Sequence, residues 1–352
     1  MEIDDLTRRT GEWLRGEGPS SKVVISSRIR LARNFEAYPF LSRADETARR
    51  EMYRALTDRI TETDLGQDCL VVNIDEVEPL DRQLMVERHL ISKQHADGEG
   101  CRGVVVSADE TRALMIHEED HLRIQCLRSG LQLETLWQEV DRIDDLLEER
   151  VEYAYDEKFG YLTACPTNVG TGIRVSVMLH LPGLKMTNEV ERLLRAARDM
   201  RLAVRGLFGE GTDALGDFFQ ISNQATLGKS EAEIIDEFGN EVIPKLVEYE
   251  LNAREMLANE RTYQLDDRIW RAYGTLCHAR TIGTDETLFL LSHLRLGVQM
   301  NRFKLVDLAT INQLFLLTQR AHLQKINGGP MDGEKRSIAR AELLRQRLGS
   351  SN

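Results

Sequence analysis

The chain has 352 residues, of which 41% are hydrophobic and 30% are charged, and its formal net charge at pH 7 is −12. This length suits two domains, or one large domain with a helical appendage, and the hydrophobic fraction is enough for a sizeable core. The acidic balance argues against nucleic acid as a partner, because phosphate backbones are bound by basic surfaces.

The first two thirds of the chain alternate between short apolar runs, typical of strands, and amphipathic stretches, typical of helices. Apolar residues recur at helical spacing over 133–147 and over 190–197, and Asn188 is the predicted N-cap of the second helix. The strand predictions cover, in chain order, residues 23–25, 69–74, 103–107, 113–116, 122–126 and 173–181.

The pattern changes at Ser230, which forms an S-x-x-E capping box with Glu233. From there to Leu348 the sequence reads as one helix after another, and Gly328-Gly329-Pro330 precedes a last, basic helix over 334–348. We therefore predict an α/β or α+β catalytic domain over 1–228 and an all-α domain over 229–352.

The cysteines and the N-terminus exclude several classes of protein. No two cysteines have CxxC spacing, so neither a disulfide framework nor a zinc site is predicted. Residues 1–13 contain no apolar run of signal-peptide length, and no stretch approaches the ~18 apolar residues of a membrane span. We expect a cytoplasmic protein without a membrane partner. The five cysteines are Cys69, Cys101, Cys126, Cys165 and Cys277.

Arginines recur on one face of several predicted strands. Arg28 and Arg30 are two residues apart, so on a strand they share a face while Ile29 points into the core. Arg123 and Arg174 repeat the design in later strands, and Arg205 follows a fourth apolar run. Each arginine alone is more simply part of a surface ion pair. Together they indicate a shared anion, such as a triphosphate, or a matching cluster of carboxylates.

Three carboxylates stand in a row in the stretch 117–121, between two predicted strands. They form either a solvated acidic turn or a catalytic group. Glu210 lies between two glycines, which would let a loop close over a ligand or would make a plain flexible turn. Cys165 is either a buried structural thiol or part of a site, and the Thr-Gly-rich turn after it could cradle an anion.

Four motifs, in this order, resemble signatures of the phosphagen-kinase superfamily, the ATP:guanidino phosphotransferases. They are Ser-Ser-Arg-Ile-Arg at 26–30, Glu-Glu-Asp-His-Leu-Arg at 118–123, Cys-Pro-Thr-Asn-Val-Gly-Thr-Gly-Ile-Arg at 165–174 and Arg-Gly-Leu-Phe-Gly-Glu-Gly-Thr at 205–212. The resemblance covers about residues 20–230. It implies an α+β fold, with an antiparallel-rich sheet flanked by helices, followed by a helical C-terminal domain for dimerisation and substrate docking.

The resemblance implies ATP as the phosphoryl donor, with Mg²⁺ held through the phosphates and water rather than by a set of protein ligands. Asp120 would be an outer-shell partner of the metal. His89 matches the histidine that packs against adenine in the family, and a core histidine is the alternative. The implied nucleotide site comprises Ser26, Ser27, Arg28, Ile29, Arg30, His89, Arg123, Arg174, Val175, Ser176, Val177, Met178, Arg205, Gly206, Leu207, Phe208, Gly209 and Glu210.

The same resemblance assigns catalytic roles. An arginine guanidinium has a pKa above ~12 and is therefore cationic, with no free lone pair to attack phosphorus. Glu119 and Glu210 would grip this group, orient one nitrogen toward the γ-phosphate and accept its proton. Cys165 would act electrostatically beside the attacking nitrogen as a thiolate, and Arg123 and Arg205 would stabilise the transferring phosphoryl group.

The acceptor is predicted from the layout of the chain. Only 25 residues precede Ser26, too few for the N-terminal helical domain of small-molecule members, and the helical mass comes last. This layout resembles the bacterial protein-arginine kinases. Arginine in proteins is therefore the expected substrate, and the implied partners are a Clp-type unfoldase–protease, an activator protein and a second copy of the chain. The alternatives are a kinase for a free guanidino metabolite and a non-catalytic adaptor.

Two positions depart from the family pattern. His117 stands where the family usually has Asn. The subgroup motif Arg-Asp-x-x-Arg-Ala, which binds phosphoarginine as an allosteric ligand, is replaced here by Arg336, Ser337, Ile338, Ala339, Arg340 and Ala341. Both arginines could bind a phosphate, but Ser337 removes the carboxylate partner of the guanidinium. A basic, solvated terminal helix is the alternative for this segment.

Overall fold

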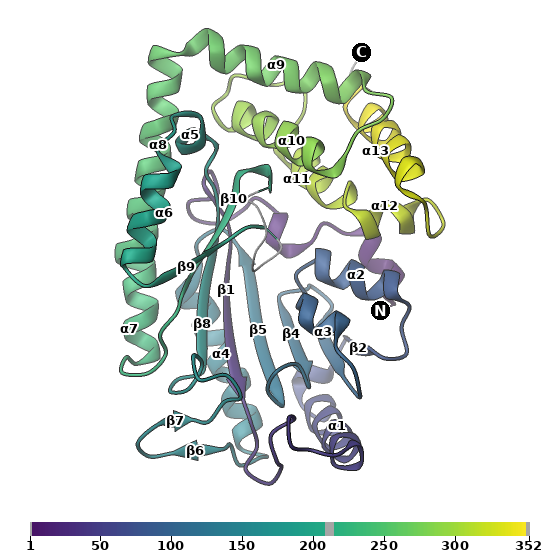
Figure 1. The fold of residues 1–352 in the computed structure, drawn as a ribbon, viewed down its shortest axis with the longest axis vertical. Helices are drawn as coiled ribbons and strands as arrows, with labels where there is room; N and C mark the ends of the chain where they lie inside the picture. The colour runs from purple at the N-terminus through teal and green to yellow at the C-terminus, as the bar shows by residue number, and fades with distance from the viewer. Residues whose placement is uncertain (1, 208–214, 350–352) are drawn as a thin grey trace.

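The computed structural model describes residues 2–207 and 215–349. Its centre is an eight-stranded sheet of order β2-β3-β4-β5-β1-β8-β10-β9, in which every paired strand is antiparallel (Figure 1). This confirms the predicted α+β fold with an antiparallel-rich sheet. The strands are β1 (Val24–Arg33), β2 (Cys69–Asn73), β3 (Gly103–Ser107), β4 (Arg112–Ile116), β5 (Leu122–Ser129), β8 (Ile173–His180), β9 (Leu202–Arg205) and β10 (Phe218–Asn223), with a separate hairpin of β6 (Tyr155–Asp156) and β7 (Gly160–Tyr161).

Alternation along the strands divides the sheet into two faces. Val105 packs with residues of α1 (Glu46–Thr61) and α4 (Leu133–Glu148), in one core that also contains Ile29 and Leu31. Val104 and Val106 point the other way, into a second core formed with α2 (Pro79–Glu87) and α3 (Lys93–Asp97). Helices α2 and α3 cover only β2 to β4 on this second face. The arginine-bearing positions of β1, β5 and β8 are left open beside them.

The C-terminal third is helical, as predicted, and covers one end of the sheet (Figure 1). The Ser230 capping box is present, because Ser230 Oγ accepts from Glu233 N and the Glu233 carboxylate accepts from Ser230 N at 2.7 Å. The helices are α7 (Glu231–Asp236), a π-helical stretch Glu237–Val242, α8 (Ile243–Glu260), α9 (Thr262–His278), α10 (Thr284–Gln299), α11 (Leu308–Leu317), α12 (Arg320–Ile326) and α13 (Gly333–Leu348). The division of the chain at residue 228 stays a prediction.

One helix start was predicted wrongly. Helix α6 (Val190–Asp199) has Glu189 at its N-cap, and Asn188 adopts a left-handed φ of 63° before it. Asn is one of the few residues that accept this conformation readily, so it ends the preceding turn instead of capping the helix. Across residues 2–207 and 215–349, no helix combines the length and the apolar character that a membrane crossing needs.

Candidate active site

A cavity of about 640 Å³ opens on the second face of the sheet. The five predicted arginines all line it, although they come from four strands: Arg28 and Arg30 from β1, Arg123 from β5, Arg174 from β8 and Arg205 from β9. They meet because β5 and β8 flank β1 in the sheet, with Arg30 directly opposite Arg174. The antiparallel register therefore converts four separate sequence motifs into one positively charged hollow.

The charge in this cavity is only partly neutralised. Within the described part of the chain, the hydrogen bonds of the Arg28 side chain go to the neutral Gln220, at 2.8 Å, and Ser176, at 3.4 Å. Burial, followed by repulsion from the neighbouring arginines, lowers the pKa of Arg28 to about 10 and that of Arg30 well below its ordinary value. Several cations held together in a partly buried cavity favour the binding of a polyanion.

Glu119 and Cys165, two of the predicted catalytic residues, lie close together at one end of the cavity. Both line it, the Cys165 thiol is hydrogen-bonded to the Thr167 hydroxyl at 3.0 Å, and the interaction of this thiol with Glu119 lowers the pKa of the carboxyl group. Burial raises the pKa of Glu119, and the nearby charges of Glu118 and Asp120 raise it further, while Arg123 at 3.5 Å acts in the opposite direction. A half-exposed carboxylate with a raised pKa is suited to accept a proton from a bound substrate.

The other two carboxylates of this stretch have different surroundings. Glu118 is buried between Arg123 Nη1, at 2.5 Å, and the Ser92 hydroxyl, at 2.6 Å. Burial raises its pKa, but these two contacts outweigh burial, so the pKa lies below the ordinary value. Sequence reasoning missed Glu118 as the residue that holds Arg123 in place. The motif shows three equal carboxylates, and only the partners from α3 and β5 distinguish them.

Asp120 does not line the cavity. Its Oδ1 accepts hydrogen bonds from Asn34 Nδ2 and from the backbone N–H of Ala164, both at 2.6 Å. Asp120 thereby fixes the residue before Cys165, and its role as an outer-shell partner of the metal stays a prediction. His117 has a left-handed φ of 62°, a conformation that Asn adopts most easily and His tolerates. The departure from the family pattern therefore leaves the acidic turn intact.

Along the predicted nucleotide-binding stretches, some side chains line the cavity or a hollow beside it and others point away, following the alternation of a strand. Ser26, Ser176 and Met178 line a small hollow next to the main cavity, together with Arg28 and His89. Leu207 and His89 also line the main cavity. By contrast, four residues of these stretches line neither hollow and are fully buried, because alternate side chains of a strand point to the opposite face. They are Ser27, Ile29, Val175 and Val177. Gly206 also lines neither hollow.

Three predicted residues, Phe208, Gly209 and Glu210, lie outside the described residues.

Gln220 of β10 was not predicted, although it contacts Arg28 and lines the cavity. Its signal was present in the sequence, because Gln220 and Ser222 alternate with Phe219 and Ile221 as polar positions of a half-buried strand. Gly172 in the Thr-Gly-rich turn is explained by packing, since a Cβ there would lie 2.7 Å from the backbone oxygen of Ala32.

The segment predicted to bind phosphoarginine lies in α13. Arg340 is 2% exposed and donates to the backbone oxygens of Thr318, at 2.8 Å, and Ile282, at 3.0 Å. Arg336, one turn earlier, is partly exposed and donates to Met331 O. The alternative of a solvated helix is therefore wrong for Arg340, which ties α13 to the helices before it. Ser337 and Ile338 are on the exposed side of the helix, and Ala341 is buried.

Comparison with known proteins gives two family matches. Residues 50–253 match the C-terminal catalytic domain of ATP:guanido phosphotransferases, and residues 262–352 match the C-terminal domain of protein-arginine kinase McsB. The chain is 43% identical over 350 residues to a protein-arginine kinase of Halothermothrix orenii, and 42% identical over 351 residues to one of Bacillus cereus strain G9842. Each alignment covers 99% of both chains.

Solved structures with the same architecture include two kinases. A duplicated taurocyamine kinase from Schistosoma mansoni superposes with a TM-score of 0.61 at 26% identity, covering 67% of this chain and 34% of that chain. A lombricine kinase superposes with a TM-score of 0.58 at 26% identity, covering 70% of each chain. Neither superposition spans the whole of this chain.

Proposed function

We propose that this chain transfers the γ-phosphate of ATP to arginine side chains of other proteins. It belongs to the ATP:guanido phosphotransferase family and, within that family, to the protein-arginine kinases. The observation that carries the proposal is the convergence of five arginines on one cavity with Glu119 and Cys165 at its end. Arginine clamps bind triphosphates, and in this proposal Glu119 and Cys165 would receive the guanidinium.

In this proposal the triphosphate lies along the row of arginines with its γ-phosphate toward Glu119. The acceptor nitrogen loses a proton to Glu119 and forms an N–P bond while the bond to the β-phosphate oxygen breaks and ADP leaves. Arg123 is held by Glu118 and would stabilise charge on the transferring group. Glu210 would hold the guanidinium from the other side.

Magnesium belongs to the proposal through its usual chemistry. No group of three or more His, Cys, Asp or Glu side chains among the described residues could hold a metal ion. In this proposal Mg²⁺ would be bound by the phosphates and water and would neutralise part of the phosphate charge. The protein's own share of that neutralisation comes from the arginines.

Proteins rather than free guanidines are the acceptors in this proposal, because relatives that match the chain from end to end are protein-arginine kinases. We further propose that phosphorylation marks proteins for a Clp-type unfoldase–protease and acts on heat-shock regulation in the cytoplasm. The helical region would support a homodimer, docking of substrate or activator proteins, and binding of phosphoarginine near Arg336. A kinase for a free guanidino metabolite is the second candidate.

The acceptor is tested by incubating the chain with Mg-ATP and either an unfolded protein or free arginine. The products are analysed by mass spectrometry at neutral pH, because the N–P bond is labile in acid. Phosphate on arginine residues of the protein is the expected result. Phosphate on free arginine alone would support the metabolite kinase, and no transfer to either acceptor would refute the proposed activity.

The raised pKa of Glu119 gives a pH prediction. Glu119 can accept a proton only when it is deprotonated. As the pH is lowered, kcat/KM should therefore begin to fall at a pH above the ordinary pKa of a glutamate. Glu118→Gln removes a neighbouring negative charge and frees Arg123 to act on Glu119, and both changes lower the Glu119 pKa. The acid limb of the pH–rate profile should therefore move to lower pH in Glu118→Gln. A limb that stays in place or moves to higher pH would contradict this assignment.

A further inference from the structure

Three consecutive residues at the end of α2, Glu87, Arg88 and His89, connect the nucleotide cavity to two distant parts of the chain. We call them the α2 turn. The N-terminal segment, with 3₁₀ turns at Ile3–Arg8 and Glu12–Leu14, lies on one side of this turn, and α12 of the helical region lies on the other. In Figure 1 the N-terminus lies beside α2 and below α12.

Glu87 is fixed by the beginning of α12. Its carboxylate is 2% exposed and accepts hydrogen bonds from the backbone N–H groups of Ala321, at 2.7 Å, and His322, at 3.1 Å. The same carboxylate lies 2.8 Å from Nδ1 of the His322 ring. Because the Arg88 guanidinium can only donate, its contact of 3.2 Å with His322 Nε2 makes that nitrogen an acceptor, so the ring proton is on Nδ1 and is donated to Glu87.

Arg88 has all five of its N–H groups engaged. It donates two hydrogen bonds to the Glu110 carboxylate, at 2.8 and 2.6 Å, two to the backbone oxygen of Arg9, at 3.3 and 3.2 Å, and one to His322. A guanidinium with five bonds and 1% exposure has one permitted position. Arg88 thus joins the N-terminal segment, the catalytic sheet and α12 at a single point.

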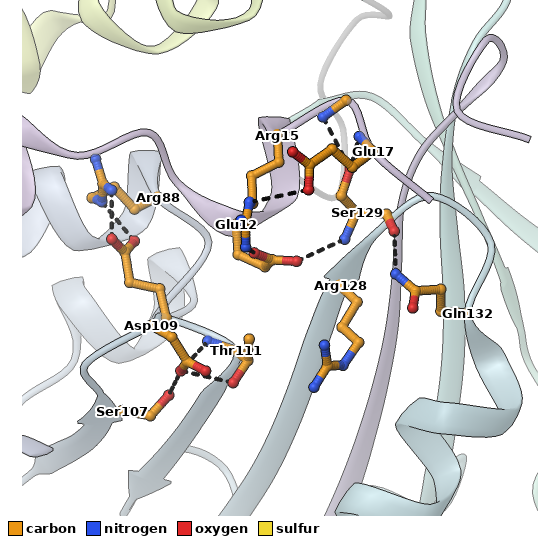
Figure 2. A network of polar contacts seen from close by, with 12 residues as sticks. Glu12, Arg15, Glu17, Arg88, Ser107, Asp109, Thr111, Arg128, Ser129 and Gln132 are labelled. Carbon is orange, nitrogen blue, oxygen red and sulfur yellow. Dashed lines mark hydrogen bonds and ion pairs between the residues drawn. The ribbon is translucent and has the colours of Figure 1, made fainter. Parts of the chain in front are cut away.

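The N-terminal segment is anchored a second time beyond Arg9. Figure 2 shows Glu12 reaching Ser129 at the end of β5, where Glu12 Oε1 accepts from the Ser129 N–H at 3.2 Å. The Ser129 hydroxyl in turn accepts from the N–H groups of Gly16, at 3.0 Å, and Glu17, at 3.2 Å. Trp13 lies between Glu12 and Gly16, which Ser129 holds on either side of it, and is 2% exposed.

Trp13 packs against the ring of His89 and orients it. The two rings are 4.5 Å apart between centroids and meet edge to face at 88°. The His89 backbone has a left-handed φ of 59°, and its carbonyl oxygen accepts from Gln125 Nε2 at 2.8 Å. A non-glycine residue keeps this conformation only where its surroundings require it. The contacts of the α2 turn supply that requirement.

His89 is at the end of the cavity that a nucleobase would occupy. It shares the small hollow with Ser26 and Met178, which lie opposite each other beyond Arg28, on the side away from Arg30 and Arg174. The γ-phosphate must face Glu119 and Cys165 for transfer to occur, so the base lies at the other end. A displacement of the α2 turn would therefore change the contact with the base and leave the phosphate clamp in place.

We infer that Glu87, Arg88, Trp13 and His322 are positioning residues for the nucleotide: through them the N-terminal segment and α12 hold His89 against the base, and the helical region thereby sets the affinity for ATP. This inference rests on the proposed binding of ATP in the arginine-lined cavity. It predicts that loss of these contacts weakens binding of a ligand that has a base, and not of one that has phosphates alone.

The test compares Mg-ATP with Mg-tripolyphosphate, using the full-length chain and isothermal titration. His322→Ala and Trp13→Leu should each raise the Kd for Mg-ATP by about tenfold and change the Kd for Mg-tripolyphosphate by less than about twofold. In both variants KM for ATP should rise while kcat at saturating ATP stays close to the original value. His322→Gln, whose amide can accept from Arg88, should recover part of the affinity.

Lys325→Ala is the matched control, because Lys325 joins α12 to Asp81 at the other end of α2 and to Asp4 of the N-terminal segment, and does not touch the α2 turn. It should leave both affinities unchanged. Equal weakening of both ligands, or no change in either, would overturn the inference while leaving the proposed nucleotide site standing. If the original chain binds neither ligand, the proposed site and this inference both fall. If His322→Ala does not fold, Trp13→Leu decides.

Discussion

Replacing Glu119 by Gln is expected to lower kcat by about 10³-fold while the affinity for Mg-ATP stays within about threefold. Gln preserves the size of the side chain and can still contact Cys165 and Arg123, but it cannot take a proton. The nucleotide clamp is formed by the arginines, so binding of Mg-ATP should survive the change. Single-turnover transfer to an unfolded protein measures the loss in the rate of transfer, and equilibrium titration measures the affinity for Mg-ATP.

Glu118→Gln is the control for this experiment. It neutralises the neighbouring carboxylate, which is buried against Arg123 and Ser92 and has no contact with Cys165. It should lower kcat much less than Glu119→Gln does, because its effect passes through the position of Arg123. More than a tenth of the original rate in Glu119→Gln would remove this residue from its assigned role as the base.

Arg30→Met should have two opposite effects: phosphoryl transfer falls by at least about 10³-fold, and the ligand-free chain becomes about 1–3 kcal/mol more stable. Arg30 is half-buried beside Arg28, Arg123 and Arg174, and although Glu118 attracts it, no carboxylate among the described residues forms an ion pair with it. Its burial and the repulsion from its neighbours therefore destabilise the fold. Met fills a similar volume without a charge. Urea unfolding and steady-state kinetics measure the two effects.

Arg33→Met provides the contrast within the same strand. Arg33 lies at the end of β1 on the opposite face, and its guanidinium is paired with Asp144 through bonds of 3.1, 3.0 and 2.5 Å. Removing it leaves a buried carboxylate without its partner, so the variant should lose about 3–5 kcal/mol of stability. If Arg30→Met loses as much stability as Arg33→Met, the arginine cluster stabilises the fold and is not a binding site whose like charges repel one another.

Much of the fold could be predicted because local signals agreed with the tertiary structure. The alternation of Arg28, Ile29, Arg30 and Leu31 indicated a strand with one charged face, and this face borders the cavity. The Ser230 capping box marked the start of the helical region correctly. The predicted N-cap at Asn188 was wrong, since an Asn can also occupy a left-handed position and the sequence does not distinguish the two.

The site was predictable in its residue types and less so in its details. Contiguous stretches were expected to line the nucleotide site with their backbones, which stays a prediction, and the strand period places the side chains of Ile29 and Val177 in the opposite core. The different roles of Glu118 and Asp120 depend on Ser92, Asn34 and Ala164, which are distant in sequence. The contribution of Trp13 was invisible for the same reason, because its contact with His89 depends on a segment crossing the end of the sheet.

The most direct test of phosphoryl transfer to arginine is a titration with Mg-ADP, nitrate and a short peptide containing arginine. Planar nitrate resembles the phosphoryl group in transfer, so the three ligands together mimic the transition state. Nitrate with the arginine peptide should raise the affinity for Mg-ADP by at least about tenfold, and nitrate with the same peptide carrying lysine should not. An affinity for Mg-ADP that is the same with both peptides would contradict a site built to join a nucleotide to a guanidinium.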